Sequence, residues 1–195
     1  MRSSMRILVL ALAALAALGA GCAQKDSGLT LRYAPVGRDV GECKAAVGVG
    51  QIRDGRGGMK AIGDRDQTVK YYPLGPAVTD WVHEALVVEF KARGCEAAAY
   101  SPGSPFSADW VVNGEVLSTY LSQTGMLGSK LHLKMRFFLD RALDASGRHV
   151  FQKTYEGTWE RTALNFSQER NEALFQEALG DLLRDVVPEL AAHMR

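Results

Sequence analysis

The chain has 195 residues, of which 47% are hydrophobic and 23% are charged, and this size and apolar content suit a single globular domain. Its 23 basic residues nearly balance its 22 acidic ones, so the net charge of +1 argues against nucleic acid or another acidic polymer as a partner. The sequence has no internal repeat and no long low-complexity tract, which argues against a repeat architecture.

The N-terminus has the pattern of a bacterial signal peptide that ends at a cysteine. Arg2 and Arg6 give a positive start, and Ile7–Leu18 is an uninterrupted apolar run. About a dozen apolar residues are too few for a helix to cross roughly 30 Å of hydrocarbon, so the run predicts a leader and not a membrane span. Small residues, Gly19–Ala20–Gly21, stand directly before Cys22 and favour cleavage there. We expect Cys22 to become an acylated N-terminus; the alternative is an ordinary signal peptide with an incidental cysteine.

Acylation of Cys22 predicts where the protein is held. Two or more acyl chains, palmitate among them, anchor a protein firmly to a membrane. In the bacterial sorting scheme that this leader resembles, Ala23 in place of an aspartate implies transfer to the outer membrane. We therefore expect a lipid-anchored, periplasm-facing outer-membrane protein of a Gram-negative bacterium. The chain then divides into a signal peptide (1–21), a polar, irregular tether and lead-in (22–42) and one periplasmic domain (43–195).

The domain begins with a predicted strand, a charged loop and a helix. Ala45–Ile52 alternates valine and glycine and is expected to form a strand. Arg53–Lys70 is rich in glycine and in charge, which predicts a flexible loop with a short hairpin. The helix begins near Pro76, because proline is favoured at the first helical position, and ends at Gly94, which suits a left-handed turn. Between them, apolar residues recur at helical spacing and form one buried stripe.

Two further cysteines each stand just before a predicted strand. Cys43 precedes the first strand, and Cys95 begins the second, Cys95–Tyr100. In a right-handed β-α-β unit, the starts of these two strands lie at the same end of the sheet. Because the periplasm is oxidising, we expect a Cys43–Cys95 disulfide, whose loop of about 52 residues would stabilise the fold by roughly 4 kcal/mol. Two separate buried thiols are the alternative.

Two long strands follow, each with one apolar face. The strand Trp110–Leu121 is expected to place Trp110, Val112, Val116 and Tyr120 on that face. The strand Leu131–Leu143 alternates most clearly, with Leu131, Leu133, Met135, Phe137 and Leu139 on one side and His132, Lys134, Arg136 and Asp140 on the other. A sheet with one dry and one wet face requires this pattern.

The last strand, Val150–Arg161, is predicted to follow a three-residue turn at Ala145–Ser146–Gly147. That turn predicts three cross-strand pairs: Phe137 with Tyr155, Leu133 with Trp159, and Arg136 with Glu156. The first two pairs would lie on the dry face and the third on the wet face. A slip of one residue would push Glu156 into the core, so the turn and the hydrophobic pattern agree.

The chain closes with a helix, Gln168–Val187, for which Ser167 is the expected N-cap and Pro188 a kink or an end. The predicted order is β-α-β-β-β-β-α. It indicates an α+β domain of two layers: a mixed or antiparallel sheet of about five strands, with two helices packed on one face.

This order of elements behind such a leader resembles the YajG-type lipoprotein family of Gram-negative bacteria. The residues that carry the resemblance are Arg53–Asp54 after the first strand, Phe90–Lys91–Ala92–Arg93–Gly94, Ala108–Asp109–Trp110–Val111–Val112 and Tyr155–Glu156–Gly157. Auxiliary lipoproteins of lipid-transporting ABC systems have a related layout. The resemblance implies an uncharacterised outer-membrane lipoprotein, and the family has no known active site to carry over.

Common catalytic and cofactor motifs are absent from the sequence. Gly48–Val49–Gly50 is not followed by the third glycine of a dinucleotide-binding fingerprint, because Arg53 holds that place. The four histidines include no pair three or four residues apart, and neither a P-loop nor a G-x-S-x-G elbow occurs. We therefore expect no catalytic residue, no metal site and no cofactor.

Two segments are candidates for contact with a partner. One is the charged loop with Arg53, Asp54 and Arg56, whose alternative interpretation is a solvated loop. The other is Met126–Leu127 at a hairpin tip, which could instead pack against the domain. The hypothesis is a membrane-anchored, non-catalytic interaction or structural module of the cell envelope with an envelope protein as partner. An accessory lipoprotein for lipid transport or outer-membrane assembly is the alternative.

Overall fold

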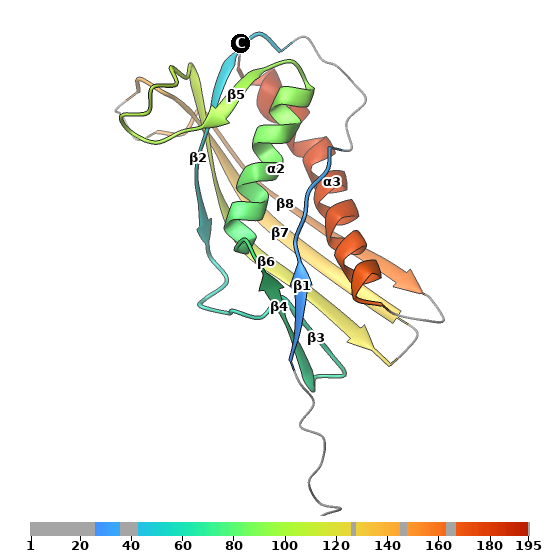
Figure 1. Ribbon diagram of the computed structural model, residues 1–195. Helices are drawn as coiled ribbons and strands as arrows, with labels where there is room; N and C mark the ends of the chain where they lie inside the picture. The colour runs from blue at the N-terminus through green and yellow to red at the C-terminus, as the bar shows by residue number, and fades with distance from the viewer. Residues whose placement is uncertain (1–25, 36–42, 126–127, 145–147, 163–166, 195) are drawn as a thin grey trace, which may run out of the picture.

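The computed structural model describes residues 26–35, 43–125, 128–144, 148–162 and 167–194. The predicted signal peptide, Cys22, Met126, Leu127 and the predicted 145–147 turn lie outside these residues. The described part forms one eight-stranded mixed sheet with two helices on one face (Figure 1). The α+β class and the two-layer arrangement are therefore as predicted, but the sheet is larger than the expected five strands.

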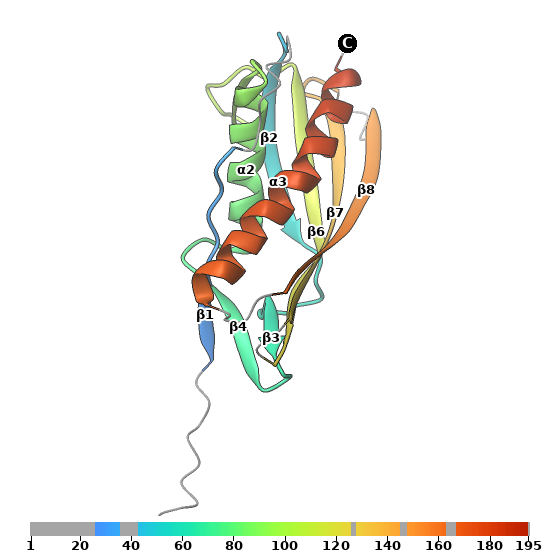
Figure 2. The same ribbon diagram turned by 90° about the vertical axis from the view of Figure 1, so that its right-hand side faces the viewer.

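The longest antiparallel part of the sheet is formed by β6 (Trp110–Thr124), β7 (Gly128–Arg141) and β8 (Phe151–Thr162). These three strands extend along the long axis of the domain, and both helices lie on the same side of them (Figure 2). The apolar row predicted for β7 is completely buried, at 0% exposure, and comprises Leu131, Leu133, Met135, Phe137 and Leu139. The alternation predicted for this strand is confirmed.

Along its other edge, β6 pairs with two groups of strands. Its first half pairs in parallel with β2 (Ala46–Asp54), and β2 pairs in parallel with β5 (Glu96–Ala99). Its second half pairs with β3 (Gly63–Arg65). Beyond β3 the sheet continues through β4 (Val69–Leu74) to the edge strand β1 (Ser27–Thr30).

The strand β1 corrects the expectation of an irregular tether. Ser27–Thr30 pairs in parallel with β4, and Leu29 is 0% exposed. Leu31, just after the strand, is 3% exposed. Alternate buried leucines in a polar segment are a period-two signal, so apolar burial makes this segment part of the domain.

The segment predicted as a charged loop is also partly ordered into the sheet. The expected hairpin is present, formed by β3 and β4, and its turn places Asp66 and Gln67 at positive φ angles of 51° and 59°. The hairpin does not project into solvent, because Ile62 and Val69 are buried, at 0% and 1% exposure.

Tyr120 is the one member of the β6 apolar row that was placed on the wrong face. The pairing of β6 with β7 shifts between Val116 and Ser118, which marks a β-bulge. A bulge adds one residue to one strand and reverses the alternation beyond it. Thr119 and Leu121 consequently face the core, and Tyr120 faces outward with Asp64.

The predicted register between β7 and β8 is wrong by two residues. Tyr155 lies opposite Met135, Trp159 lies opposite Leu131, and Glu156 lies opposite Lys134. The ladder ends at the pair Leu139–Phe151, well before the predicted turn, so a three-residue turn does not set the register. A shift of two residues keeps every side chain on its predicted face, so the hydrophobic pattern does not distinguish the predicted register from the observed one.

The two helices cover the apolar face. Helix α2 (Val78–Ala92) connects β4 to β5, starts two residues after Pro76, and is followed by Gly94 at a φ of 85°. Helix α3 (Gln168–Ala192) is capped by Ser167, whose side chain accepts a hydrogen bond from the backbone N–H of Arg170. Pro188 lies inside α3 and does not end it. Trp81 of α2 and Phe175 of α3 meet edge to face across the helix interface.

Candidate functional site

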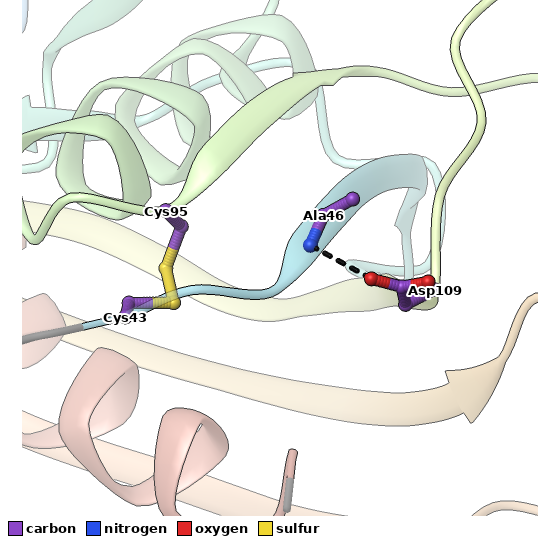
Figure 3. The surroundings of a disulfide bond; sticks show 4 residues. All are labelled: Cys43, Ala46, Cys95 and Asp109. Carbon is purple, nitrogen blue, oxygen red and sulfur yellow. Dashed lines mark hydrogen bonds between the residues drawn. A yellow bond between two sulfur atoms is a disulfide. The ribbon is translucent and has the colours of Figure 1, made fainter.

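The two predicted cysteines meet at one end of the sheet, which we call the disulfide end. Cys43 and Cys95 form a disulfide, with their Cα atoms 4.7 Å apart (Figure 3). Because β2 and β5 are parallel, Cys43 and Cys95 stand side by side just before these strands. The structure thus contains the expected bridge for the expected topological reason.

Hydrogen bonds fasten the start of β2 and the residues before it to the start of β6 and to the end of α2. Asp109 accepts a hydrogen bond from the Ala46 N–H through Oδ2 at 3.1 Å, and its own N–H donates to the Ala46 carbonyl at 2.8 Å (Figure 3). The Cys43 N–H donates to the Arg93 carbonyl at the end of α2 at 3.4 Å. The backbone around the disulfide is therefore held on two sides.

A cavity of about 670 Å³ opens beside the disulfide, and we call it the disulfide-end hollow. It lies where the last turns of α3 meet the starts of β2 and β6. Its lining consists of Cys43, Lys44, Ala45, Arg93, Asp109, Trp110, Pro188, Ala191, Ala192 and Met194. Four separate chain segments supply these residues, so no local sequence motif describes the site.

The charges of the hollow are predominantly positive. Lys44 and Arg93 make no ion pair with any described residue. Arg141 lies over the Trp110 ring with its Cζ 4.8 Å from the centroid, a cation–π contact at the rim. Asp109 is the only acidic side chain among the described residues of the lining, and its carboxylate already accepts the Ala46 N–H.

Apolar groups form the rest of the lining, chiefly Trp110, Pro188 and Met194. A hollow that combines cations with apolar side chains can bind an anionic ligand that also carries an apolar group. Such a ligand would gain charge-assisted contacts and the burial of apolar surface together. Among the described lining residues, no nucleophile is paired with a base.

The predicted contact residues of the 53–56 segment lie away from the hollow, at the opposite end of β2. Asp54 and Arg56 are bound to each other, with Nε–Oδ1 and Nη2–Oδ2 distances of 2.9 and 2.7 Å. This bidentate bond with Arg56 holds the pKa of Asp54 below its usual range. Arg53 is exposed at the end of the strand. Asp54 and Arg56 thus pair with each other within one loop. The other predicted contact residues, Met126 and Leu127, lie outside the described residues.

A buried carboxylate was missed by the sequence interpretation, which placed Asp64 in a solvated loop. Asp64 is 6% exposed and accepts hydrogen bonds from the Tyr120 hydroxyl and from the Gln67 N–H, while Lys70 Nζ lies 3.0 Å from Oδ2. Burial alone would raise the pKa of Asp64, but the Tyr120 and Lys70 contacts outweigh it and hold the pKa below its usual value. The charge is compensated, so this cluster stabilises the β3–β4 hairpin.

A second set of buried polar side chains connects this hairpin to α3. The Tyr71 hydroxyl donates to Gln123 Oε1, and Asn171 Nδ2 donates to the same oxygen at 3.3 Å. Ser129 Oγ donates to Asn171 Oδ1 at 3.1 Å. Asn171, Gln123 and Ser129 are each 3% exposed, and we call the four residues the buried polar network. The sequence signal for this network was one polar residue at an inward-facing position of each strand, Gln123 in β6 and Ser129 in β7.

The exposed face of the β6–β7–β8 sheet consists largely of charges that pair with one another. Glu156 accepts from Lys134 at 2.7 Å and contacts His132 at 2.9 Å, and these two contacts lower the pKa of Glu156. Arg136 pairs with Glu115 across β6 and not with Glu156 as predicted. Since its charges are mutually satisfied, this face is a weaker candidate for a binding site than the hollow.

Among the described residues, no group of three or more histidine, cysteine, aspartate or glutamate side chains could hold a metal ion. None of the described helices is both long enough and apolar enough to span a bilayer.

Comparison with known proteins establishes the fold. No family model and no curated protein matches this chain. Among solved structures, protein XCC0632 from Xanthomonas campestris, of the family DUF330, is similar, with a TM-score of 0.59 and 16% identity over 85% of this chain and 94% of that one. An uncharacterised protein matches with a TM-score of 0.52 and 10% identity over 85% of this chain and 99% of that one.

The hypothetical protein CT253 from Chlamydia trachomatis is similar as well. It has a TM-score of 0.51 and 11% identity over 77% of this chain and 98% of that one. At these identities the similarity shows a shared fold and does not extend to a shared function. The fold thus recurs in bacterial proteins of uncharacterised role, and the YajG resemblance remains a prediction.

Proposed function

We propose that this protein is a lipid-anchored, non-catalytic module of the cell envelope that binds another envelope protein through the disulfide-end hollow. The observation that carries the proposal is the presence beside apolar side chains, in one cavity, of Lys44 and Arg93, two cations that make no ion pair among the described residues. The leader that ends at Cys22 supports the location in the envelope.

The anchor and the hollow have complementary roles in this proposal. Acyl chains at Cys22 concentrate the domain at a membrane surface, so that a weak contact becomes effective without a large interface. The hollow supplies the specificity, because it suits an acidic segment that also presents an apolar side chain. Arg93 and Arg141 present planar guanidinium groups, which match the geometry of a carboxylate better than a lysine does.

The test is photocrosslinking in intact envelopes. A photoreactive residue replaces Ala192, which is exposed and lines the hollow, or Thr154, which is exposed on the sheet face and serves as the matched control position. We expect one specific protein adduct from position 192 and none from position 154. The double variant Lys44→Glu/Arg93→Glu should abolish that adduct, and Cys22→Ser should reduce it strongly. An adduct that survives charge reversal would refute the hollow as the binding site.

The alternative function, an accessory role in lipid transport, is favoured by one observation. The side of the hollow formed by Trp110, Pro188 and Met194 is apolar and could accept an acyl chain. This alternative predicts phospholipid, and no protein adduct, bound to the purified lipidated protein. Mass spectrometry of the extracted lipid distinguishes the two functions, with a Pro188→Glu variant as the control that should lose the lipid.

A further inference from the structure

The first strand fixes the point at which the domain is attached to its predicted anchor. Leu29 and Leu31 are buried in the core, and the Thr30 N–H donates to Glu172 Oε1 of α3 at 2.7 Å. The Lys70 N–H donates to Asp26 Oδ1 at 3.3 Å, and the Trp81 indole donates to the Arg32 carbonyl at 3.0 Å. Residues 26–32 therefore belong to the folded domain.

The free linker between the anchor and the domain is consequently very short. Only three residues separate Cys22 from Asp26. Four Cα–Cα steps span at most roughly 14 Å when fully extended. The predicted tether of residues 22–42 would have allowed the domain to turn in any direction. A linker of this length holds one end of the domain close to the acylated residue.

Asp26 lies at the end of the domain opposite the disulfide. Its carboxylate contacts the strand β4 beside the β3–β4 turn, and Asp66 in that turn accepts the Gly125 N–H at the far end of β6. The disulfide end is at the other end of β6, because Trp110 begins that strand and Asp109 directly precedes it. Figure 1 shows β1, β3 and β4 at one end of the molecule and β5 with the C-terminus at the other.

The length of β6 measures the distance between the two ends. Its 15 residues, at about 3.3 Å per residue, extend over roughly 45 Å, which is about three times the reach of the linker. We propose that the β3–β4 end of the domain faces the bilayer, and that the disulfide-end hollow is held away from it. The proposal rests on the lipid anchor of the proposed function.

Charge is too weak and too short-ranged to impose the reverse orientation. Lys44, Arg93 and Arg141 attract the disulfide end toward an anionic bilayer when it lies close to the surface. Glu96 and Asp109 at the same end offset part of this attraction. The field of the bilayer also decays over about 8 Å at physiological salt, much less than the length of the domain. The linker therefore determines which end lies nearest the membrane.

At the β3–β4 end the charges are largely paired with one another. Lys70 pairs with Asp64, and Lys130, near the far end of the β6–β7 hairpin, pairs with Glu160. The described residues of this end form no dense basic patch, so it fits a phospholipid surface of mixed headgroups through proximity and not through strong electrostatic attraction.

The orientation can be tested by energy transfer to the membrane. The native lipidated protein is reconstituted in vesicles of phosphatidylethanolamine and phosphatidylglycerol that contain an acceptor-labelled lipid. A donor dye is attached through an azidophenylalanine at Thr124, at the β3–β4 end, or at Leu143, which is 98% exposed at the disulfide end. We expect transfer from position 124 to be about threefold higher or more, because roughly 45 Å separates the two positions.

The control inserts a flexible Gly/Ser segment of about twenty residues after Lys25, which adds a reach of roughly 25 Å. With the insertion, the two positions should approach equal transfer. Equal or reversed transfer in the uninserted, membrane-bound protein would overturn the orientation and leave the anchored function standing. Absence of the protein from the membrane fraction would overturn both.

Discussion

The two ends of the domain are stabilised in different ways. The disulfide end is held by a covalent bond and by backbone hydrogen bonds, while Lys44 and Arg93 remain without ion pairs among the described residues. At the β3–β4 end, polar side chains are buried and bonded to one another, as Asp64 and Asn171 illustrate. The charges are paired at the β3–β4 end, whereas two cations at the disulfide end have no ion pair among the described residues. This contrast indicates that stability and recognition depend on different ends of the molecule.

The largest effect is expected from the covalent bond of the disulfide end. Replacing both cysteines, Cys43→Ala with Cys95→Ala, should lower the free energy of unfolding by about 4 kcal/mol, since the loop of about 52 residues is no longer closed in the unfolded chain. Urea denaturation of the oxidised wild type and the double variant measures the loss. A loss below about 1 kcal/mol would show that the hydrogen bonds alone hold this end.

The buried polar network of the other end should show the next largest effect. Asn171→Ala leaves Ser129 without its acceptor and removes one donor to Gln123, so we expect a loss of about 2–3 kcal/mol in the free energy of unfolding.

Thr119 provides a matched control for Asn171. Its hydroxyl is buried and has no hydrogen-bond partner among the described residues. Thr119→Val should therefore leave stability unchanged or raise it by about 1 kcal/mol. If Thr119→Val destabilises the protein as much as Asn171→Ala, the network has no special role.

The Asp64 cluster gives the β3–β4 end a dependence on acid. Because the pKa of Asp64 is lower in the folded protein than in the unfolded chain, its contribution is complete above the unfolded pKa, near 4, and is lost as the pH falls through the folded value. Asp64→Asn should cost about 1–2 kcal/mol at neutral pH.

The same variant should unfold with a weaker dependence on pH below about 4 than the wild type. Urea midpoints measured from pH 7 down to pH 3 check this. Parallel acid dependences in the two proteins would remove Asp64 from the account of stability.

The smallest effect on stability should come from the cations of the hollow. Lys44→Glu/Arg93→Glu should change the free energy of unfolding by no more than about 0.5 kcal/mol, because no ion pair among the described residues is lost. The crosslink from position 192 should nevertheless disappear. A large loss of stability in this variant would mean that the two cations are structural, and the contrast between the two ends would fail.

The long strands and both helices could be predicted from the sequence because their apolar periods are long. The five alternate apolar residues of β7, from Leu131 to Leu139, identified the buried face, although not the register with β8. The strands β1, β3 and β4 are short and lie in polar surroundings, so their burial depends on neighbours that are distant in sequence. The bulge near Val116 has no sequence signature in a single chain.

The candidate site was much less predictable than the fold. Cys43 and Cys95 indicated that two strand starts converge, and the disulfide end follows from them. The hollow also needs Arg93, Trp110 and Pro188, which come from α2, β6 and α3 and meet only in the folded domain. The predicted contacts at Arg53, Asp54 and Arg56 rested on local charge, and local charge is often satisfied locally, as the Asp54–Arg56 pair is.

The most direct test of the central claim is metabolic labelling with palmitate, followed by separation of the membrane and soluble fractions. The account predicts that the wild-type chain carries the label and sediments with outer-membrane vesicles, whereas Cys22→Ser carries none and is released. An unlabelled wild-type protein in the osmotic-shock fluid would contradict the anchor and every role assigned to it.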